Sequence, residues 1–443
     1  MGHERASNGG SAATVRTALK SYIAVLLLLT FVASCVVVVR KFVLHKPDTH
    51  SLAFCCPGAE FSDFTDLSER VVHFGEPDML SRTDFIVPYP YPVPSIYAFL
   101  FFVRLFPRPL AAYLLFALLS FFVATFCLSS RVKQISSGHL QQVAIWSTLL
   151  LSYPLAILLD RGNIEAVIWV LVLLGIVAYM RGKMLLSASF WAGAASMKVF
   201  PALLFVMFLA KRKYRVFGFA IAATATITLL ALAGVGPTLR QAALDSSRSA
   251  AFIQKNYILA RNNLQFDHSL LCATKQVIHL YPETPADEGE AIRRAVRLYS
   301  IVVPVGAVLL WWLRLRRMPL LNQLMAYLAM CILLPYVSGE YTLTYVYLIW
   351  GAFLLFLLED VATARVQIPA TSIYMILISC ACLVAPLFYI EHNGHLGYSG
   401  PIKTVFLLIL LGTVLREPMP SSLFADLPLP ESDPKTENPS QLV

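Results

Sequence analysis

The sequence predicts an all-α protein, a polytopic bundle of about 10–12 membrane segments with a large outer loop. Of its 443 residues, 58% are hydrophobic and only 14% are charged, which is too little charge to cover a water-soluble domain. Apolar runs of roughly 17–25 residues recur along the chain, and a helix of this length crosses the hydrocarbon core of a bilayer. These runs are too long and too uniformly apolar for the strands of a membrane barrel.

Short basic clusters between the apolar runs indicate which ends lie in the cytoplasm. The formal net charge is +9, and the positive-inside rule places clustered Lys and Arg on the cytoplasmic side. The clusters are Arg131 with Lys133, Arg181 with Lys183, residues 211–215, and residues 314–317. The basic residues near Arg16 and Lys20 place the N-terminus on the same side. No combination of aromatic and basic residues indicates a nucleic-acid partner.

The first part of the chain alternates between apolar runs and polar segments. A first membrane helix is expected at about residues 20–39, because the run is too long for a signal peptide and no Ala-x-Ala cleavage site follows. An outer segment rich in carboxylates is expected at about 41–94. The short apolar piece at 95–106 ends at two prolines, so we expect it to lie along the interface. Membrane helices follow at about 110–129, 140–159 and 164–180.

The stretch at 185–210 breaks the alternation because basic clusters flank it on both sides. Lys198 and Pro201 lie in its interior. Two half-helices that meet near these residues would explain both features, provided that the break is buried in protein or lines a cavity. The alternative is one long tilted helix in which Lys198 pairs with a neighbour.

The alternation then resumes up to the C-terminal tail. A long outer segment with charged amphipathic stretches is expected at about 236–297. Membrane helices are expected at about 217–234, 298–313, 320–335, 341–358, 368–390 and 402–415. The transmembrane domain therefore covers 20–416. Residues 1–19 and 417–443 are polar and rich in Gly and Ser or in Pro, Ser and acids, so both are predicted to be disordered in the cytoplasm.

The cysteines and histidines do not form a metal-binding pattern. Most of the eight cysteines lie in apolar runs, where Cys packs as a small hydrophobe. Cys55, Cys56 and Cys272 fall in outer segments, and one of the first two could form a bridge with Cys272 in an oxidising compartment. His392 and His395 lack a third ligand nearby. No obligatory metal or cofactor is expected, although a divalent ion on phosphate oxygens stays open.

Three outer segments hold the polar residues that could carry chemistry. They are 61–66, 160–165 and 262–269. Ionisable groups at membrane depth cost energy and usually serve a function.

Four elements in and around these segments occur in a distinctive order. They are Ser62-Asp63-Phe64, the Tyr/Pro-rich run at 88–94, Arg161-Gly162-Asn163, and the run from Gly193 to Lys198 and Pro201. In this order the chain resembles glycosyltransferase family 87 of the GT-C superfamily, over roughly residues 20–415. The best-known members are polyprenyl-phosphate-mannose-dependent α-1,2-mannosyltransferases. Two elements differ from the family pattern: His268-Ser269-Leu270 replaces an Asn-Gln-Ser-Leu-like element, and Glu340-Tyr341 stands where His is common.

The resemblance implies a sugar donor linked to polyprenyl phosphate and a lipid or glycan acceptor. A general base must take the acceptor's proton as its oxygen attacks the anomeric carbon. Asp63 matches the family's first-loop aspartate, and Asp66, three residues away, is the rival. One carboxylate suffices for direct displacement with inversion because phosphate is already a good leaving group, unlike the sugar released by a glycosidase.

Further site residues are expected around this base. The leaving phosphate needs cationic or donor groups, and the candidates are Arg161, Arg261, His268, Lys198 and Lys255. The expected substrate-binding residues are Tyr89, Tyr91, Asn163, Glu340 and Tyr341.

The expected function is therefore transfer of a hexose, most simply mannose, at the outer face of a bacterial plasma membrane. Two alternatives stay open. A transporter or flippase of polyprenyl-linked sugars would show internal repeats and mid-helix charges, and we see no convincing repeat. A polysaccharide polymerase or ligase would favour Arg/His pairs in the long outer segment.

Overall fold

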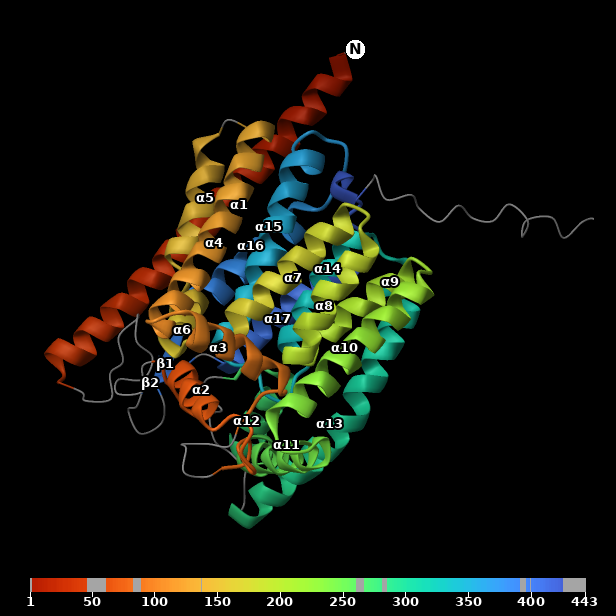
Figure 1. Ribbon diagram of the computed structural model, residues 1–443. Helices are drawn as coiled ribbons and strands as arrows, with labels where there is room; N and C mark the ends of the chain where they lie inside the picture. Colours follow the sequence, from red (N-terminus) through yellow and green to blue (C-terminus); the bar gives the residue numbers. More distant parts are fainter. Residues whose placement is uncertain are drawn as a thin grey trace, which may run out of the picture.

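The computed structural model describes residues 2–45, 61–82, 89–136, 138–259, 267–280, 285–390, 396–398 and 400–424. Within these ranges the protein is a bundle of helices (Figure 1), which confirms the predicted fold class. The short strands β1 (Phe388–Ile390) and β2 (Leu396–Tyr398) pair antiparallel.

Six helical stretches in the described ranges are long and apolar enough to cross a membrane. They are Gly10–Val43, Pro109–Ile135, His139–Arg161, Tyr214–Val235, Asp287–Arg317 and Glu340–Val361. Six shorter apolar helices of 10–17 residues accompany them. The outermost long helices expose most of their apolar side chains, which suits contact with lipid rather than with water. The chain is a multi-pass membrane protein.

The core is made of helices from the C-terminal half. Every residue of α14 (Leu320–Leu333) after the first is buried. It packs against α15 (Tyr345–Phe356) and α17 (Gly400–Arg416), and α17 packs in turn on α16 (Ala370–Val384). The long helix α1 (Gly2–Val38) crosses the bundle obliquely along α16 (Figure 1).

The helices of the N-terminal half surround this core. In chain order they are α4 (Pro109–Ile135), α5 (His139–Leu150), α6 (Tyr153–Arg161), α7 (Glu165–Met180), α8 (Met184–Met197), α9 (Val206–Ala210) and α10 (Tyr214–Val235). The span expected at 140–159 is divided between α5 and α6. Pro154 has no N–H to continue α5, and the Ser152 hydroxyl caps α6 by accepting from the Leu155 N–H at 3.1 Å.

The predicted break near Lys198 is confirmed. Lys198 is extended, with φ −157° and ψ 128°, directly after α8. The chain continues as a 3₁₀ helix, η2 (Phe200–Phe205), before α9 begins. Lys198 is buried, and Lys198, Val199 and Phe200 line a cavity, which is a setting that a break at membrane depth requires.

Both ends of the chain are more ordered than the sequence suggests. Helix α1 begins at Gly2 rather than near residue 20, because no proline interrupts the growth of a helix that is already nucleated. After α17, residues 417–424 pack on the bundle, where the Asn322 amide accepts from the Met419 N–H at 2.8 Å and donates to the Glu417 carbonyl at 2.7 Å. Residues 425–443 lie outside the described ranges.

The outer segments form a layer over one end of the bundle, opposite the N-terminus (Figure 1). The first contributes α2 (Ser62–Val72) and is followed by α3 (Pro94–Leu105). The long one contributes α11 (Leu239–Ile253), the π-helix η3 (Gln254–Ile258), α12 (Leu270–Leu280) and the start of α13 (Pro285–Leu313). Helix α13 therefore begins before the span expected at 298–313.

Hydrogen bonds join the two outer segments into one unit. The buried Asp245 carboxylate on α11 accepts from the N–H groups of Leu80 at 2.7 Å and Ser81 at 3.0 Å. The Ser249 hydroxyl, one turn further on, donates to the Tyr89 carbonyl at 2.5 Å.

Substitution Asp245→Ala should therefore loosen this layer. It leaves two backbone donors without acceptors, at a cost of about 2–4 kcal/mol, and should lower the melting temperature measured in detergent by several degrees. Arg248→Ala is the matched control on the same helix. Its partner Asp78 and Arg248 itself are both exposed, so we expect a change below about 1 kcal/mol. Equal melting temperatures for the two variants would contradict this role of Asp245.

Candidate active site

A tight corner between α6 and α7 shapes one side of the site. Helix α6 ends with Gly162 in the left-handed region at φ +61°, while the Asn163 N–H donates back to the Leu158 carbonyl at 3.2 Å. A Cβ on Gly162 would lie 2.7 Å from the Cβ of Phe64 on α2. Glycine is therefore required twice, for the backbone turn and for the close approach of α2.

Asp63 lies in the first turn of α2, directly against this corner. Its Oδ1 accepts from Arg161 Nη2 at 2.5 Å, and its Oδ2 accepts from Asn163 Nδ2 at 2.6 Å. Asn163 Nδ2 also contacts the Tyr91 hydroxyl at 2.7 Å. The Asp63 carboxylate is thus held in one orientation while its side chain keeps 15% of its surface exposed.

A second ion pair lies at the break after α8. The Lys198 ammonium pairs with Glu165, the first residue of α7, and the Glu165 side chain is fully buried. A carboxylate at a helix N-terminus is favourable. The Glu165 N–H donates to Asn163 Oδ1 at 3.0 Å. The ammonium also lies 5.0 Å from the centre of the Tyr341 ring. Because Asn163 bonds both to Asp63 and to the Glu165 N–H, it connects the two ion pairs.

A third polar group joins the long outer segment to the start of η6 (Glu340–Thr344). Asp267 Oδ1 accepts from the N–H groups of Ser269 at 2.9 Å and Ser338 at 2.8 Å. Glu340 Oε2 pairs with Lys403 Nζ at 2.8 Å, in a fully buried contact, and lies 3.8 Å from His268 Nε2.

Burial shifts the pKa values of both outer-segment residues in this group. It raises the pKa of Asp267 to about 6, against the backbone hydrogen bonds of Ser269 and Ser338. It lowers the pKa of His268 to about 4, so this imidazole is neutral at pH 7.

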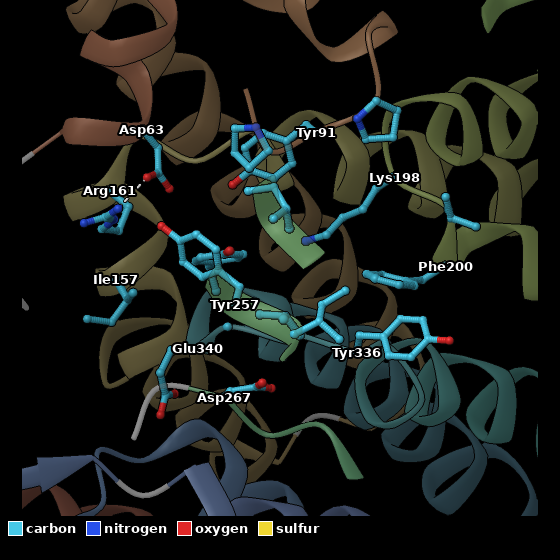
Figure 2. Close-up of a pocket in the computed structure, with 18 residues that line it drawn as sticks. Asp63, Tyr91, Ile157, Arg161, Lys198, Phe200, Tyr257, Asp267, Tyr336 and Glu340 are labelled. Atoms are coloured by element: carbon cyan, nitrogen blue, oxygen red, sulfur yellow. Dashed lines mark hydrogen bonds and ion pairs between the residues drawn. The ribbon is translucent and has the colours of Figure 1, made fainter. Parts of the chain in front are cut away.

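All three groups border one cavity of about 490 Å³. Figure 2 shows Asp63 and Arg161 on one side, Lys198 and Phe200 on another, and Asp267 with Glu340 on a third. The remaining lining is largely apolar and consists of Pro90, Tyr91, Pro92, Ile157, Val199, Ile253, Tyr257, Ile258, Tyr336, Val337, Gly339 and Tyr341. A cavity of this size, with few convergent polar groups on mostly apolar walls, is typical of a ligand site.

Half of the site residues expected from sequence line this cavity. They are Asp63, Tyr91, Arg161, Lys198, Glu340 and Tyr341. Asn163 and His268 do not line the cavity themselves, but Asn163 donates to Asp63 and His268 lies 3.8 Å from Glu340. Tyr89 is buried and its hydroxyl contacts Ser95. Asp66 and Lys255 are outside the set that lines the cavity, and Arg261 lies outside the described residues.

Asp66 lies three residues after Asp63 on α2, and burial of its side chain raises its pKa above the usual value.

Four polar residues of the site were not among the individual site residues expected from the sequence, although Glu165 and Asp267 lie in the outer segments 160–165 and 262–269. The four are Glu165, Tyr257, Asp267 and Lys403. A signal existed for two of them, because Glu165 and Lys403 are lone charges at the edges of apolar runs.

In the described part of the chain, no group of three or more His, Cys, Asp or Glu could hold a metal ion. His392 and His395 lie outside that part, as do Cys55 and Cys56, so the possible bridge to the buried Cys272 also falls outside it.

The pKa shifts of Asp267 and His268 predict opposing effects on stability below neutral pH. The raised pKa of Asp267 favours the folded state as the pH falls through 6, because the fold binds this proton more tightly than the unfolded chain. The lowered pKa of His268 destabilises the fold as the pH falls below 6.5, because only the unfolded chain binds that proton. In wild type the two effects partly cancel.

In Asp267→Asn only the His268 contribution remains, and Asn Oδ1 can still accept both N–H bonds. Acidification from pH 7 to pH 5 should therefore cost the variant about 1 kcal/mol more than wild type. Melting temperatures from pH 7 to pH 5 measure the difference. Parallel pH profiles for the two proteins would show that Asp267 does not titrate in this range and would contradict its raised pKa.

Comparison with known proteins gives one family. The model of glycosyltransferase family 87 matches residues 89–339. No curated protein and no solved structure shows significant similarity to the chain. Since the match covers more than half of the sequence, this multi-pass membrane protein belongs to glycosyltransferase family 87.

Proposed function

We propose that this glycosyltransferase moves a hexose from a polyprenyl-phosphate sugar to an acceptor hydroxyl on a lipid or glycan, with mannose as the favoured hexose. The observation that carries the proposal is the Asp63 carboxylate, which Arg161 and Asn163 hold at the wall of a cavity that also contains a lysine and an apolar side.

Asp63 is suited to act as the general base. Each carboxylate oxygen has two lone pairs, so the hydrogen bonds from Arg161 and Asn163 leave acceptor capacity for a substrate hydroxyl. The acceptor oxygen attacks the anomeric carbon, the bond from that carbon to the phosphate oxygen breaks, and the proton passes to Asp63. Polyprenyl phosphate leaves with the electron pair, and the anomeric configuration inverts.

Lys198 and Arg161 are the cavity cations that can meet the donor phosphate. Each is paired with a carboxylate, which keeps it charged at a site poor in water. An ammonium has three donors and a guanidinium has five. Both therefore retain donors for phosphate oxygens as negative charge develops on the leaving group. Lys255, His268 and Arg261 stay secondary candidates for this role.

The remaining walls suit the other parts of the two substrates. Phe200 and Tyr336 lie on the same side as Lys198 (Figure 2), and Val199 also lines the cavity. This apolar side fits the first isoprene units of the donor. Asp267 and Glu340 lie on another side, where carboxylates can accept hydrogen bonds from sugar hydroxyls.

The two ends of the molecule support an extracytoplasmic site in a bacterial plasma membrane. Arg131 pairs with Glu359, and Arg314 donates to the carbonyls of Leu415 and Arg416. These contacts gather two basic clusters and the C-terminal segment at one end, which the positive-inside rule assigns to the cytoplasm. The outer layer over the cavity lies at the opposite end (Figure 1).

Asp63→Asn tests the proposed base. The amide keeps the size of the side chain and can still accept from Arg161, but it cannot take the proton. We expect kcat for transfer from a polyprenyl-phosphate hexose to fall by about 10²–10⁴-fold, with a much smaller change in the donor KM. Asp66→Asn is the matched control on the same helix and should keep activity within about three-fold. Full activity in Asp63→Asn would remove Asp63 from the mechanism, and the reverse ranking of the variants would assign the base to Asp66.

A further inference from the structure

A second cavity, a cleft that opens on the apolar surface of the bundle, lies away from the site. Its volume is about 830 Å³. It runs between α4 and α7, which diverge in Figure 1, and α15 forms its floor. Apolar side chains such as Leu119, Val123, Leu173 and Val177 make most of its lining. The cleft is open at the surface of the bundle, where Leu119 is 50% and Val123 55% exposed, so in a membrane an apolar chain rather than water is expected to fill it.

The length and position of this cleft match one leaflet of a bilayer. Along α7 it extends from Trp169 to Arg181, which at 1.5 Å per residue is about 18 Å. Half of the hydrocarbon core is about 15 Å. The ring of Trp169 stacks on Phe121 at 4.0 Å, on the side nearer the start of α7.

The other end of the cleft is cationic. Arg131 and Arg181 both line it, and each begins one of the basic loop clusters. Glu359 holds Arg131 through two bonds of 3.1 and 2.8 Å. Arg181 is exposed, and none of its side-chain atoms bonds to another described residue. Positive charge at the end of an apolar cleft between membrane helices suits the headgroup of an anionic lipid.

We propose that the cleft binds one anionic phospholipid of the leaflet next to Arg131 and Arg181. Its phosphate lies at Arg181, with Arg131 as a second contact, and an acyl chain lies along α7 toward Trp169. Leu423 and Phe424 line the same cleft, so the lipid also packs against the ordered C-terminal segment. This site is separate from the catalytic cavity and does not depend on the identity of the sugar donor.

The cleft also has a structural route to the active site. The Trp169 indole N–H donates to the Thr344 carbonyl at 3.1 Å. Thr344 ends η6, the element that carries Glu340 and Tyr341 into the catalytic cavity. Helix α7 itself begins with Glu165, the partner of Lys198. A lipid between α4 and α7 therefore supports two elements that hold cavity residues.

The test is native mass spectrometry of the full chain released from nanodiscs of phosphatidylglycerol and phosphatidylcholine in equal amounts. Wild type should retain one phosphatidylglycerol in preference to phosphatidylcholine. Arg181→Gln should lower this retention about five-fold. Leu173→Trp fills the cleft without changing charge and should lower retention of the lipid to a similar extent. Lys213→Gln removes an exposed cation that does not line the cleft, and should leave retention unchanged.

Three results would overturn the proposal. One is equal retention of both lipids by wild type, and another is wild-type retention in Arg181→Gln. The third is a loss in Lys213→Gln as large as in Arg181→Gln, which would indicate a general surface-charge effect. Size-exclusion profiles and melting temperatures of each variant confirm that it is folded, so a failure to fold is not mistaken for a loss of lipid binding.

Discussion

The position of the proposed base depends on the buried side chain of Asn163. Its amide nitrogen donates to Asp63 and contacts Tyr91, while its amide oxygen accepts from the first N–H of α7. The Asn163 carbonyl also accepts from the Tyr113 hydroxyl on α4. One fully buried residue thereby connects the first outer segment, the Tyr/Pro-rich run and two membrane helices. Because nearly every polar atom of Asn163 is used, a shift of any one element would leave a buried group unpaired.

Two buried ion pairs extend this arrangement across the bundle. Glu165 with Lys198, and Glu340 with Lys403, have little or no exposed side-chain surface. Taking charges out of water is expensive, and such pairs are weak evidence for stability. Each pair has one member on the wall of the cavity. The member on the wall is the cation Lys198 in one pair and the carboxylate Glu340 in the other, so the pairs present one charge of each sign to the cavity.

Much of the fold could be predicted from sequence because its signals are local. The apolar runs and the basic flanks of the 185–210 stretch are each local features of the sequence, so the helical fold class and the break at Lys198 were predicted, whereas the bounds of several helices differ from the expected spans. The order of residues 417–424 could not be predicted, because it depends on Asn322, which is far away in the sequence. The early start of α1 was missed because composition alone suggested a disordered end.

The site could be predicted only in part. Asp63 and Arg161 were both candidates, but 98 positions separate them, and their contact depends on how Gly162 turns the chain under Phe64. Asp267 lies in the expected segment 262–269 but was not picked out individually, since its role depends on the backbone of Ser338. The proposed Asp63 also precedes the stretch that matches the family, which begins at residue 89. Its assignment therefore depends on geometry as well as on resemblance.

The anomeric configuration of the product tests the central claim most directly. With a single base and a leaving phosphate, the account predicts one direct displacement. A proton NMR spectrum of the glycoside made from a polyprenyl-phosphate hexose of known configuration should then show the opposite configuration at the anomeric carbon. Retention of configuration would contradict the account, because it would require a covalent or otherwise two-step path in which Asp63 does not act as the base for the acceptor hydroxyl.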